Sequence, residues 1–380
     1  MQVGETIYLD YQASTPMDER VLQMMQAASA TCFANPHAAD HALGWRAAAA
    51  IKTAAAQVGN LFGLQGDDVI FTSGASEANA MAIRTADAIA VRAQRTELLV
   101  GAADHGSILN EAAQSRLSAR HIPLNERGAP DPDRLRAMIS EASALVSIVG
   151  VNNENGAIAD LKAISDICKS NGVLFHADLS QAPLAMDIDL LDLDIAFATI
   201  SSHKLYGPKG VGALLTGPGM SESIAPVITG AGQQGGRRGG TMPTELIVGF
   251  GEACRIISEN GETERVRVTA IRDHFIKSLE EKHIASVIGS LEQRHPGNAL
   301  MHFPNQDAAD LLARLQPFIA ASTQSACSSG NIEPSHVVQA MGYERGFASE
   351  CIRFSFGRFS DCKQVDQAVA MIENLLLGDL

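Results

Sequence analysis

The chain has no uninterrupted apolar run close to the about 20 residues that a membrane-spanning helix requires. Its first residues, MQVGETIYLDYQAS, also lack the basic region followed by an apolar stretch that marks a secretory signal. These two absences predict a protein without a membrane partner, and we expect it in the cytoplasm.

Positive charge is also scarce. The chain has 29 Lys+Arg against 43 Asp+Glu, a formal net charge of −14 at pH 7. A surface with this much negative charge repels the phosphate backbone of nucleic acids, unless a local basic patch outweighs the average charge. The only dense basic spot is Arg237-Arg238, inside a glycine run, and it is too short for a nucleic-acid surface. We therefore expect no direct nucleic-acid partner.

Cysteines are few, and their spacing carries no metal motif. The six stand at positions 32, 168, 254, 327, 351 and 362, with no CxxC pair. We expect no metal site, and mostly buried thiols in a reducing compartment. Cys327 differs, because its setting Ser-Ala-Cys-Ser-Ser-Gly is small and polar, which is typical of an exposed loop. A GxGxxG motif after an early strand is also missing, which argues against a nicotinamide-dependent dehydrogenase.

What the chain does contain is the pattern of an α/β fold. With 380 residues, 46% of them hydrophobic, it is long enough for two structural units. Short apolar runs alternate with amphipathic segments, which indicates a mostly parallel sheet covered by helices on both faces. The apolar runs are 69–71, 98–100, 145–151, 173–175, 195–200 and 211–215, and long helices are expected at 38–61 and 252–283.

The pattern changes after about residue 252, where a long helical stretch leads into short strands and helices. We expect a large domain over residues 18–255. A smaller α/β domain would be formed by residues 1–17 and 256–380 and would carry the loop of Cys327.

Small polar residues follow the first apolar run. The segment Thr72-Ser73-Gly74-Ala75-Ser76-Glu77 stands between a strand that ends at Phe71 and a helical segment. Glycine and small hydroxyl residues at a helix N-terminus can direct N–H groups and hydroxyls at an anion, typically a phosphate. A simple capped helix after a turn fits this segment equally well.

An acidic and a basic side chain follow two later runs. Asp178 comes after the run at 173–175, and Lys204 after the run at 195–200. Ligands gather at the carboxyl ends of strands in open α/β sheets, and a buried ion pair is a weak stability device, so the two charges suggest a functional site. Pyridoxal phosphate requires a lysine for a Schiff base, a carboxylate beside its pyridine nitrogen and a phosphate cradle. Lys209 is the alternative lysine, but it lies beyond a Gly-Pro turn, where we expect a solvated side chain.

Three further polar positions follow apolar runs. His105 could stack on a planar ring, although a lone histidine is more often structural. Asn152-Asn153-Glu154 offers amide groups to a cofactor or substrate. Gln181, three residues past Asp178, could donate a hydrogen bond to the phenolic oxygen of a pyridoxal ring.

Several segments match one family in the order of the chain, from about residue 7 to 360. They are Ile7-Tyr8-Leu9-Asp10, Phe71-Thr72-Ser73-Gly74-Ala75, Val151-Asn152-Asn153-Glu154, Ser202-His203-Lys204 with Gly207-Pro208-Lys209-Gly210, and Ser325-Ala326-Cys327 with Glu333-Pro334-Ser335. Each is weak alone, but the combination is specific. The sequence resembles the cysteine desulfurases, which belong to the class V aminotransferase superfamily and share the pyridoxal-phosphate (PLP) fold-type I.

The resemblance implies an enzyme that converts L-cysteine to L-alanine. Lys204 would form the Schiff base, Asp178 would hold the pyridine nitrogen, and His105 would stack on the ring and transfer protons. Gln181 looks like the residue near the phenolic oxygen. The sulfur would pass to Cys327 as a persulfide and then to an acceptor protein.

The resemblance also implies the remaining binding positions. Cofactor-binding residues would include Ala75, Ser76, Ser201, His203 and Asn152, with Thr241 supplied by the other subunit of a homodimer. Arg353 and Asn152 resemble the positions that hold the substrate carboxylate, and planar Arg353 suits bidentate recognition. Arg358 is the alternative arginine, and motif order favours Arg353.

Three departures from the family pattern stand out. The glycine run at 230–241 lacks the His-Glu-Arg that relatives often carry, although Arg238 is retained. Ser76 replaces the commoner threonine and keeps the hydroxyl. The sequence ends at Leu380, whereas relatives that dock an iron–sulfur cluster scaffold often have a longer tail, so we do not assume that partner.

Other activities stay open at this point. The same superfamily includes selenocysteine lyases, kynureninase-like lyases and aminotransferases, and a non-enzymatic protein on a degenerate fold is a further alternative. The presence of Lys204, Asp178 and His203 makes a non-enzymatic protein the less favoured alternative. The acceptor pathway is equally open among iron–sulfur cluster assembly, tRNA thiolation and DNA phosphorothioation.

Overall fold

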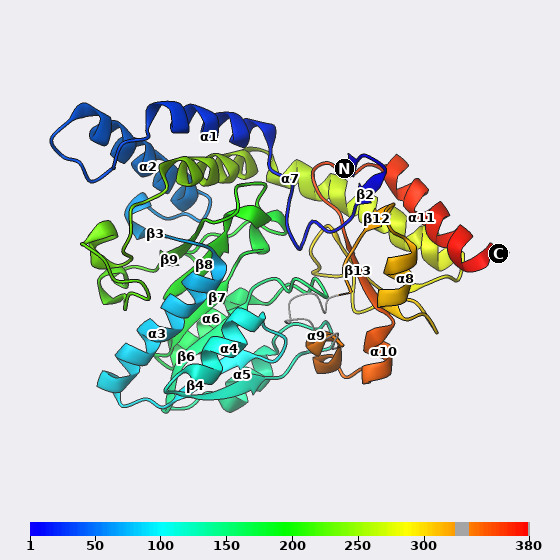
Figure 1. Ribbon diagram of the computed structural model, residues 1–380. Coiled ribbons are helices and arrows are strands. Elements are labelled where there is room, and N and C mark those ends of the chain that lie inside the picture. Colours follow the sequence, from blue (N-terminus) through cyan, green and yellow to red (C-terminus); the bar gives the residue numbers. More distant parts are fainter. Residues whose placement is uncertain (324–333, 379–380) are drawn as a thin grey trace.

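The computed structural model describes residues 1–323 and 334–378, and its centre is a seven-stranded sheet (Figure 1). The strands in spatial order are β3 (Val69–Thr72), β9 (Gly212–Thr216), β8 (Phe197–Ser201), β7 (Leu174–Asp178), β6 (Ser143–Val149), β4 (Glu97–Gly101) and β5 (Ser118–Ile122). Strand β9 runs antiparallel to both of its neighbours, and the other pairs are parallel. The mostly parallel sheet predicted from the apolar runs is therefore confirmed.

Strands β3, β6, β8 and β9 are buried along their whole length, which explains why their sequences are nearly continuous apolar runs. One polar group interrupts this pattern at the middle of the sheet. The His176 ring lies between Ser147 Oγ at 2.8 Å and Thr199 Oγ1 at 3.0 Å, so both ring nitrogens have a partner. A satisfied polar cluster of this kind is compatible with burial.

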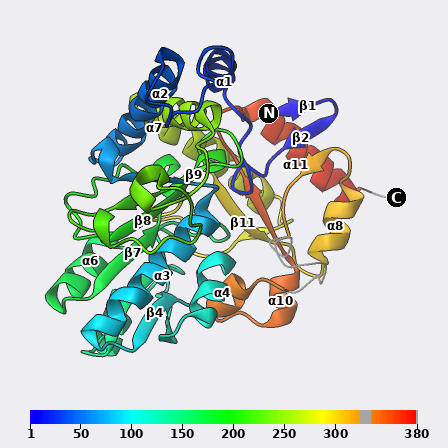
Figure 2. The same ribbon diagram turned by 60° about the vertical axis from the view of Figure 1, so that its left-hand side comes forward.

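Helices cover both faces of the sheet. Helices α2 (Ala42–Asn60), α5 (Pro132–Met138), α6 (Leu161–Ser170) and α7 (Thr244–Glu281) share one core cluster with the strands. On the opposite face lie α3 (Ala75–Ala93) and α4 (Gly106–Gln114), as Figure 2 shows. Helix α1 (Glu19–Thr31) packs on α7 outside this layer. The seven-stranded sheet thus forms the middle layer of three.

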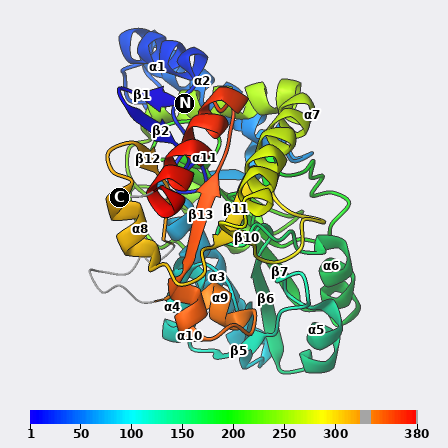
Figure 3. The ribbon, with the colours of Figure 1, turned by 90° about the vertical axis from the view of Figure 1, so that its right-hand side faces the viewer.

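A second hydrophobic core is formed by residues of two small sheets and of the helices packed on them. Figure 3 shows these sheets. These sheets contain β1 (Gln2–Val3), β2 (Thr6–Tyr8) and β12 (Ile319–Ala320), and β10 (Ser286–Val287), β11 (Asn298–His302) and β13 (Cys351–Ser355). The helices of this region are α8 (Ala308–Arg314), α9 (His336–Ala340), α10 (Arg345–Ser349) and α11 (Cys362–Leu377). Ile7 and Leu9 from the N-terminal arm are part of this core.

Helix α7 contributes to both cores, with Phe250 in the first and Phe275 in the second. It begins eight residues before the start expected from the sequence, because its first turns are buried and lack an amphipathic pattern. A Cβ on Gly251 would lie 2.7 Å from Ala54 Cα, so glycine is required where α7 meets α2. Since α7 passes unbroken through residues 255 and 256, the domain boundary placed there stays a prediction.

No helix in the described part of the chain is long and apolar enough to cross a membrane.

Candidate active site

A pocket of about 280 Å³ opens at the carboxyl ends of β6, β7 and β8, beside the start of α3. It is lined by Ala13, Ala75, Ser76, His105, Val149, Val151, Asn153, Asp178, Ser180, Gln181, Ser201, His203 and Lys204. Eight residues that the sequence singled out are in this lining: Ala75, Ser76, His105, Asp178, Gln181, Ser201, His203 and Lys204. Parallel strands carry them to one edge of the sheet because their carboxyl ends meet there.

Lys204 ends the short 3₁₀ turn Ser202–Lys204 that follows β8. Its Nζ donates hydrogen bonds to the carbonyl oxygens of Gln12 at 2.6 Å and Ala13 at 2.9 Å. The N-terminal arm therefore reaches the pocket and contacts the lysine, which the sequence did not predict. Lys209, the alternative lysine, is exposed and does not line the pocket.

Asp178 is the last residue of β7 and is 5% exposed. Its Oδ2 accepts a hydrogen bond from Asn79 Nδ2 at 2.8 Å, and its Oδ1 accepts one from the Ser180 backbone N–H at 2.9 Å. Asn79 lies on α3 and is fully buried. Its Nδ2 also lies 2.9 Å from Ser107 Oγ, which contacts His105. The carboxylate is thus held at the pocket floor by fixed donors.

His105 caps the N-terminus of α4. Its Nδ1 accepts from the Ser107 N–H at 3.1 Å, so in the neutral ring the proton is on Nε2. Burial lowers the pKa of His105, and Asp178 partly opposes this effect. The side chain is therefore a neutral imidazole at physiological pH and can exchange a proton through Nε2.

The other end of the pocket is rich in hydrogen-bond donors. Ser76, Ser201 and His203 line it together with Ala75, the first residue of α3. Helix N-termini with free N–H groups and small hydroxyls bind phosphate. Burial lowers the pKa of His203 to about 4, with Lys204 and Lys209 adding to the effect, so its ring is neutral at pH 7.

The glycine run contacts this end through an ion pair. Arg238 Nε lies 2.8 Å from Glu77 Oε1 in the first turn of α3, and Glu77 Oε2 accepts from the Ser73 N–H at 2.7 Å. Gln234, in the part of the run that departs from the family, pairs its side-chain amide with the backbone N–H and C=O of Phe71, both at 2.8 Å. Thr241 is exposed and outside the pocket lining of its own chain.

Asn152 does not line the pocket. Its Nδ2 donates to the Ala103 carbonyl at 2.8 Å, and its Oδ1 accepts from the N–H groups of Glu154 and Asn155. The side chain therefore shapes the loop after β6, and the neighbouring Asn153 reaches the lining instead.

Arg353 lies directly behind this loop. It is 4% exposed, with Nη1 donating to the Asn153 carbonyl and Nη2 to Asp10 Oδ1, both at 2.7 Å. Its Nε has no partner among the described residues. Arg358, the alternative arginine, is bound elsewhere by Asp18 and Glu264.

Cys327 and the segment 324–333 lie outside the described residues. The residues on either side contact groups that adjoin the pocket lining without being part of it. Ser322 forms a two-way backbone pair with Arg353, and Ser335 Oγ donates to the carboxylate of buried Glu154. His336 Nε2 lies 3.0 Å from the carbonyl of Asp104, next to His105 in the chain.

Four of the other five cysteines are buried, namely Cys32, Cys168, Cys254 and Cys351. Burial raises the pKa of Cys168 and of Cys351 to about 12, which keeps these thiols protonated and unreactive. The exception is Cys362, the first residue of α11, which is exposed.

Sequence reasoning missed Asn79, Ser107 and Ser180. Asn79 follows Ser76 by three residues, which places it on the same face of α3, and this spacing was the available signal. The contacts of Ser107 and Ser180 depend on how loops fold back and leave no pattern. Among the described residues, no group of His, Cys, Asp or Glu is arranged to hold a metal ion.

Comparisons with known proteins identify the family of this chain. A model of the aminotransferase class-V family matches residues 7–368. The cysteine desulfurases IscS of Rickettsia bellii and Rickettsia massiliae are each 36% identical over 371 residues, which cover 96% of this chain and 90% of theirs.

Solved structures agree as well. A NifS-like protein superposes with a TM-score of 0.91 at 28% identity, covering 98% of this chain and 99% of that one. SspA in complex with cysteine has a TM-score of 0.82 at 29% identity, covering 94% and 100%. The family resemblance and the fold class expected from the sequence are confirmed, and this chain belongs to the aminotransferase class-V family.

Proposed function

We propose that this protein is a pyridoxal-phosphate-dependent cysteine desulfurase. It converts L-cysteine to L-alanine and receives the sulfur on Cys327 as a persulfide. The observation that carries the proposal is that Lys204 and Asp178, from two neighbouring strand ends, line one pocket. Relatives named cysteine desulfurase at 36% identity, and a related structure that contains cysteine, support it.

The pocket fits the cofactor. Its volume of about 280 Å³ is close to the lower bound of about 300 Å³ for small-molecule sites. An amine, a carboxylate and a donor-rich helix start lie around it, which is the set that pyridoxal phosphate requires. The buried Ser180 Oγ in the lining also has no partner among the described residues, so a polar atom is free for a bound group.

When bound, the cofactor draws electrons from the Cα of the amino-acid substrate. Lys204 would hold it covalently and later accept the Cα proton on Nζ. Asp178 would face the pyridine nitrogen, and the bond from Asn79 keeps that carboxylate in place. Gln181 would lie near the phenolic oxygen, and His105 would stack on the ring and move protons through Nε2.

The phosphate would bind at the start of α3. Ala75 with its free N–H, Ser76, Ser201 and neutral His203 supply the donors there. The Arg238–Glu77 pair cancels the Glu77 charge that would otherwise repel a phosphate. Asn152 would act indirectly, by holding Asn153 in the pocket wall.

The substrate carboxylate would be recognised by Arg353. Its Nε has no partner among the described residues, and its guanidinium is already fixed by Asp10 and the Asn153 carbonyl. A preorganised planar cation recognises a carboxylate with little loss of entropy. Arg358 already forms ion pairs with the carboxylates of Asp18 and Glu264, so it is the weaker candidate for binding the substrate carboxylate.

The active enzyme would be a homodimer that delivers sulfur to an acceptor protein. Thr241 lies outside the pocket of its own chain, so a partner's pocket is where its hydroxyl would act. Apolar surface for such an interface is supplied by Phe33, two residues past α1, and by Trp45, in the first turn of α2, which are 71% and 58% exposed.

The deciding experiment is to incubate the purified holoenzyme with L-cysteine and a reductant. Alanine and sulfide should appear in equal amounts, and a Cys327→Ser variant should release almost no sulfide. Transamination does not require a cysteine residue in the enzyme. If the Cys327→Ser variant still consumed L-cysteine without forming alanine, this result would point to an aminotransferase. Faster turnover with L-selenocysteine that does not need Cys327 would point to a selenocysteine lyase.

A further inference from the structure

Tyr206, two residues after Lys204, has an unusual backbone conformation. Its φ is 62°, in the left-handed region that non-glycine residues rarely adopt, and it is 1% exposed. The Tyr206 N–H donates to Thr15 Oγ1 at 2.7 Å, and its carbonyl accepts from the Asp18 N–H at 3.0 Å. Such a conformation persists only where neighbouring contacts enforce it.

Two further contacts come from Arg358, in the loop after β13. Its guanidinium carbon lies 4.0 Å from the centroid of the Tyr206 ring, which is a cation–π contact. Its backbone N–H donates to the Tyr206 hydroxyl at 2.6 Å. A Cβ on Gly357 would lie 2.5 Å from this hydroxyl, so only glycine lets the loop approach so closely.

Arg358 is itself held from two other segments. Its Nε donates to Glu264 on α7 at 2.8 Å, and its Nη1 donates to Asp18 at 2.7 Å. The side chain is 11% exposed, so both ion pairs are shielded from water. Arg20, and then Arg358, lower the pKa of Asp18. Arg358 therefore connects the C-terminal core, α7 and the start of α1 to the turn that carries Lys204.

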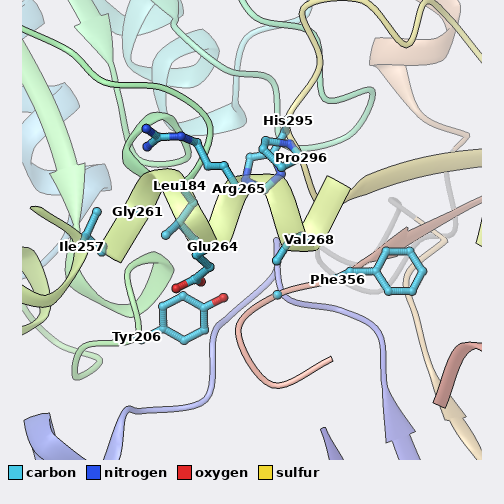
Figure 4. A pocket seen from close by; sticks show the side chains of 11 residues that line it. Leu184, Tyr206, Ile257, Gly261, Glu264, Arg265, Val268, His295, Pro296 and Phe356 are labelled. Atoms are coloured by element: carbon cyan, nitrogen blue, oxygen red, sulfur yellow. The ribbon is translucent and has the colours of Figure 1, made fainter. Parts of the chain in front are cut away.

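The Tyr206 ring also has free space beside it. A cavity of about 20 Å³ is bordered by Tyr206, Glu264, His295 and Phe356, and Figure 4 shows the ring and the Glu264 carboxylate close together. This volume is enough for about one water molecule. The ring therefore has an unfilled gap beside it, and its contacts with Arg358 restrain it.

We propose that Arg358 is a positioning residue that fixes Lys204 through Tyr206. The proposal rests on the function assigned to Lys204 above. The C-terminal core thereby holds the backbone turn from which the lysine extends, together with the N-terminal arm that binds Lys204 Nζ through the Gln12 carbonyl. Displacing a reacting group by about 1 Å can cost about 10²-fold in rate.

The test compares Arg358→Lys and Tyr206→Phe with the control Arg20→Met. Lysine keeps the charge but lacks the planar guanidinium that stacks on the Tyr206 ring and directs fixed N–H groups at Asp18 and Glu264. Phenylalanine removes only the hydroxyl that accepts from Arg358. Arg20 shares Asp18 with Arg358 but has no described contact with Tyr206, and its side chain is 50% exposed.

Three measurements separate positioning from general stability. In Arg358→Lys, kcat for L-cysteine should fall about 10²-fold while KM changes less than about twofold. The midpoint of the pH titration of the visible absorption band of the holoenzyme should shift. In cofactor-free protein, hydrogen exchange at the Tyr206 amide should be roughly tenfold faster. Tyr206→Phe should change all three in the same direction by less, and Arg20→Met should match the wild type.

The proposal would be overturned if Arg358→Lys kept the wild-type kcat, titration midpoint and hydrogen-exchange rate. It would also be overturned if Arg20→Met changed these three quantities as much as Arg358→Lys does. This failure can be told from a failure of the proposed function. If Lys204→Ala keeps a covalent cofactor bond, the assignment of the lysine is wrong, whereas the exchange rate at Tyr206 in cofactor-free protein reports on Arg358 alone.

Discussion

Asn79 Nδ2 lies 2.8 Å from Asp178 Oδ2, and this buried hydrogen bond joins α3 to the end of β7. The same Nδ2 lies 2.9 Å from Ser107 Oγ, which contacts His105 Nδ1 at 2.8 Å. One amide thus links the carboxylate proposed for the pyridine nitrogen to the histidine proposed to stack on the ring. A hydrogen bond to a charged group contributes about 1.5–3 kcal/mol, so the link has a measurable effect.

Asn79→Leu should weaken cofactor binding by about 10- to 100-fold, because Asp178 loses a fixed donor while it remains buried. The measurement is a titration of cofactor-free protein with pyridoxal phosphate, followed by fluorescence. Asn110→Ala, on the exposed face of α4, is the control and should bind as the wild type does. Unchanged affinity in Asn79→Leu would show that this bond does not support the site.

Lys204→Ala should lose the covalent bond to the cofactor and the activity with it. Borohydride reduction followed by mass spectrometry should place the pyridoxyl group on the Lys204 peptide of the wild type. Lys209→Ala is the matched control, because Lys209 is exposed and outside the pocket, and it should keep the adduct. An adduct that persists in Lys204→Ala would contradict the assignment.

Cys327→Ser should still bind L-cysteine and change the cofactor spectrum, because Lys204, Asp178 and Arg353 are intact. It should release almost no sulfide, and without a reductant the wild type should carry a persulfide on the Cys327 peptide. Cys362→Ser is the stringent control, since Cys362 is the exposed thiol among the described cysteines. A persulfide found on Cys362 or Cys351 would contradict the role of Cys327.

Two inactive variants, Lys204→Ala and Thr241→Asp, should partly restore activity when they are mixed and allowed to exchange subunits. In the mixed dimer one pocket has both an intact lysine and an intact Thr241 from the neighbour, provided that the site is shared. Size measurement at assay concentration serves as the independent check. A fully active monomer would exclude the shared site.

His295 should make the cofactor-free protein less stable in mild acid. Burial, with Arg272 and Arg353 adding to it, lowers the pKa of His295 to about 3, whereas the ordinary histidine value is 6.5. The unfolded state therefore binds more protons below pH 6.5, and the free energy of unfolding falls as the pH drops from there toward 3. This shift corresponds to a few kcal/mol at the acid end.

The variant His295→Asn isolates this contribution. Asn can still accept from the Gly297 N–H that bonds His295 Nδ1 at 3.0 Å, but it does not titrate. Burial raises the pKa of Asp104 to about 8, so this group makes the folded state more stable as the pH falls. Asp104 is present in both the wild type and His295→Asn, so its contribution cancels in the comparison. Urea unfolding between pH 7 and 5 should show a shallower loss in His295→Asn than in the wild type. Exposed His37→Asn should match the wild type.

Local patterns in the sequence were enough to predict the sheet and most of the pocket lining. Buried parallel strands require continuous apolar runs, so runs such as 145–151 and 195–200 identified β6 and β8. Residues that follow such strands must meet at one edge, which is why Asp178 and Lys204 could be expected together. These features depend on local periodicity, which can be read from a single sequence.

The contacts between distant segments could be identified only from the folded structure. Asn79 to Asp178, Gln12 to Lys204 and Arg358 to Tyr206 join residues between 99 and 192 positions apart. We expected Asn152 to bind the cofactor and substrate directly, yet its amide shapes the loop and Asn153 lines the pocket. Such pairings depend on how segments far apart in the chain pack against each other. A long-range contact leaves no periodic signal in the sequence.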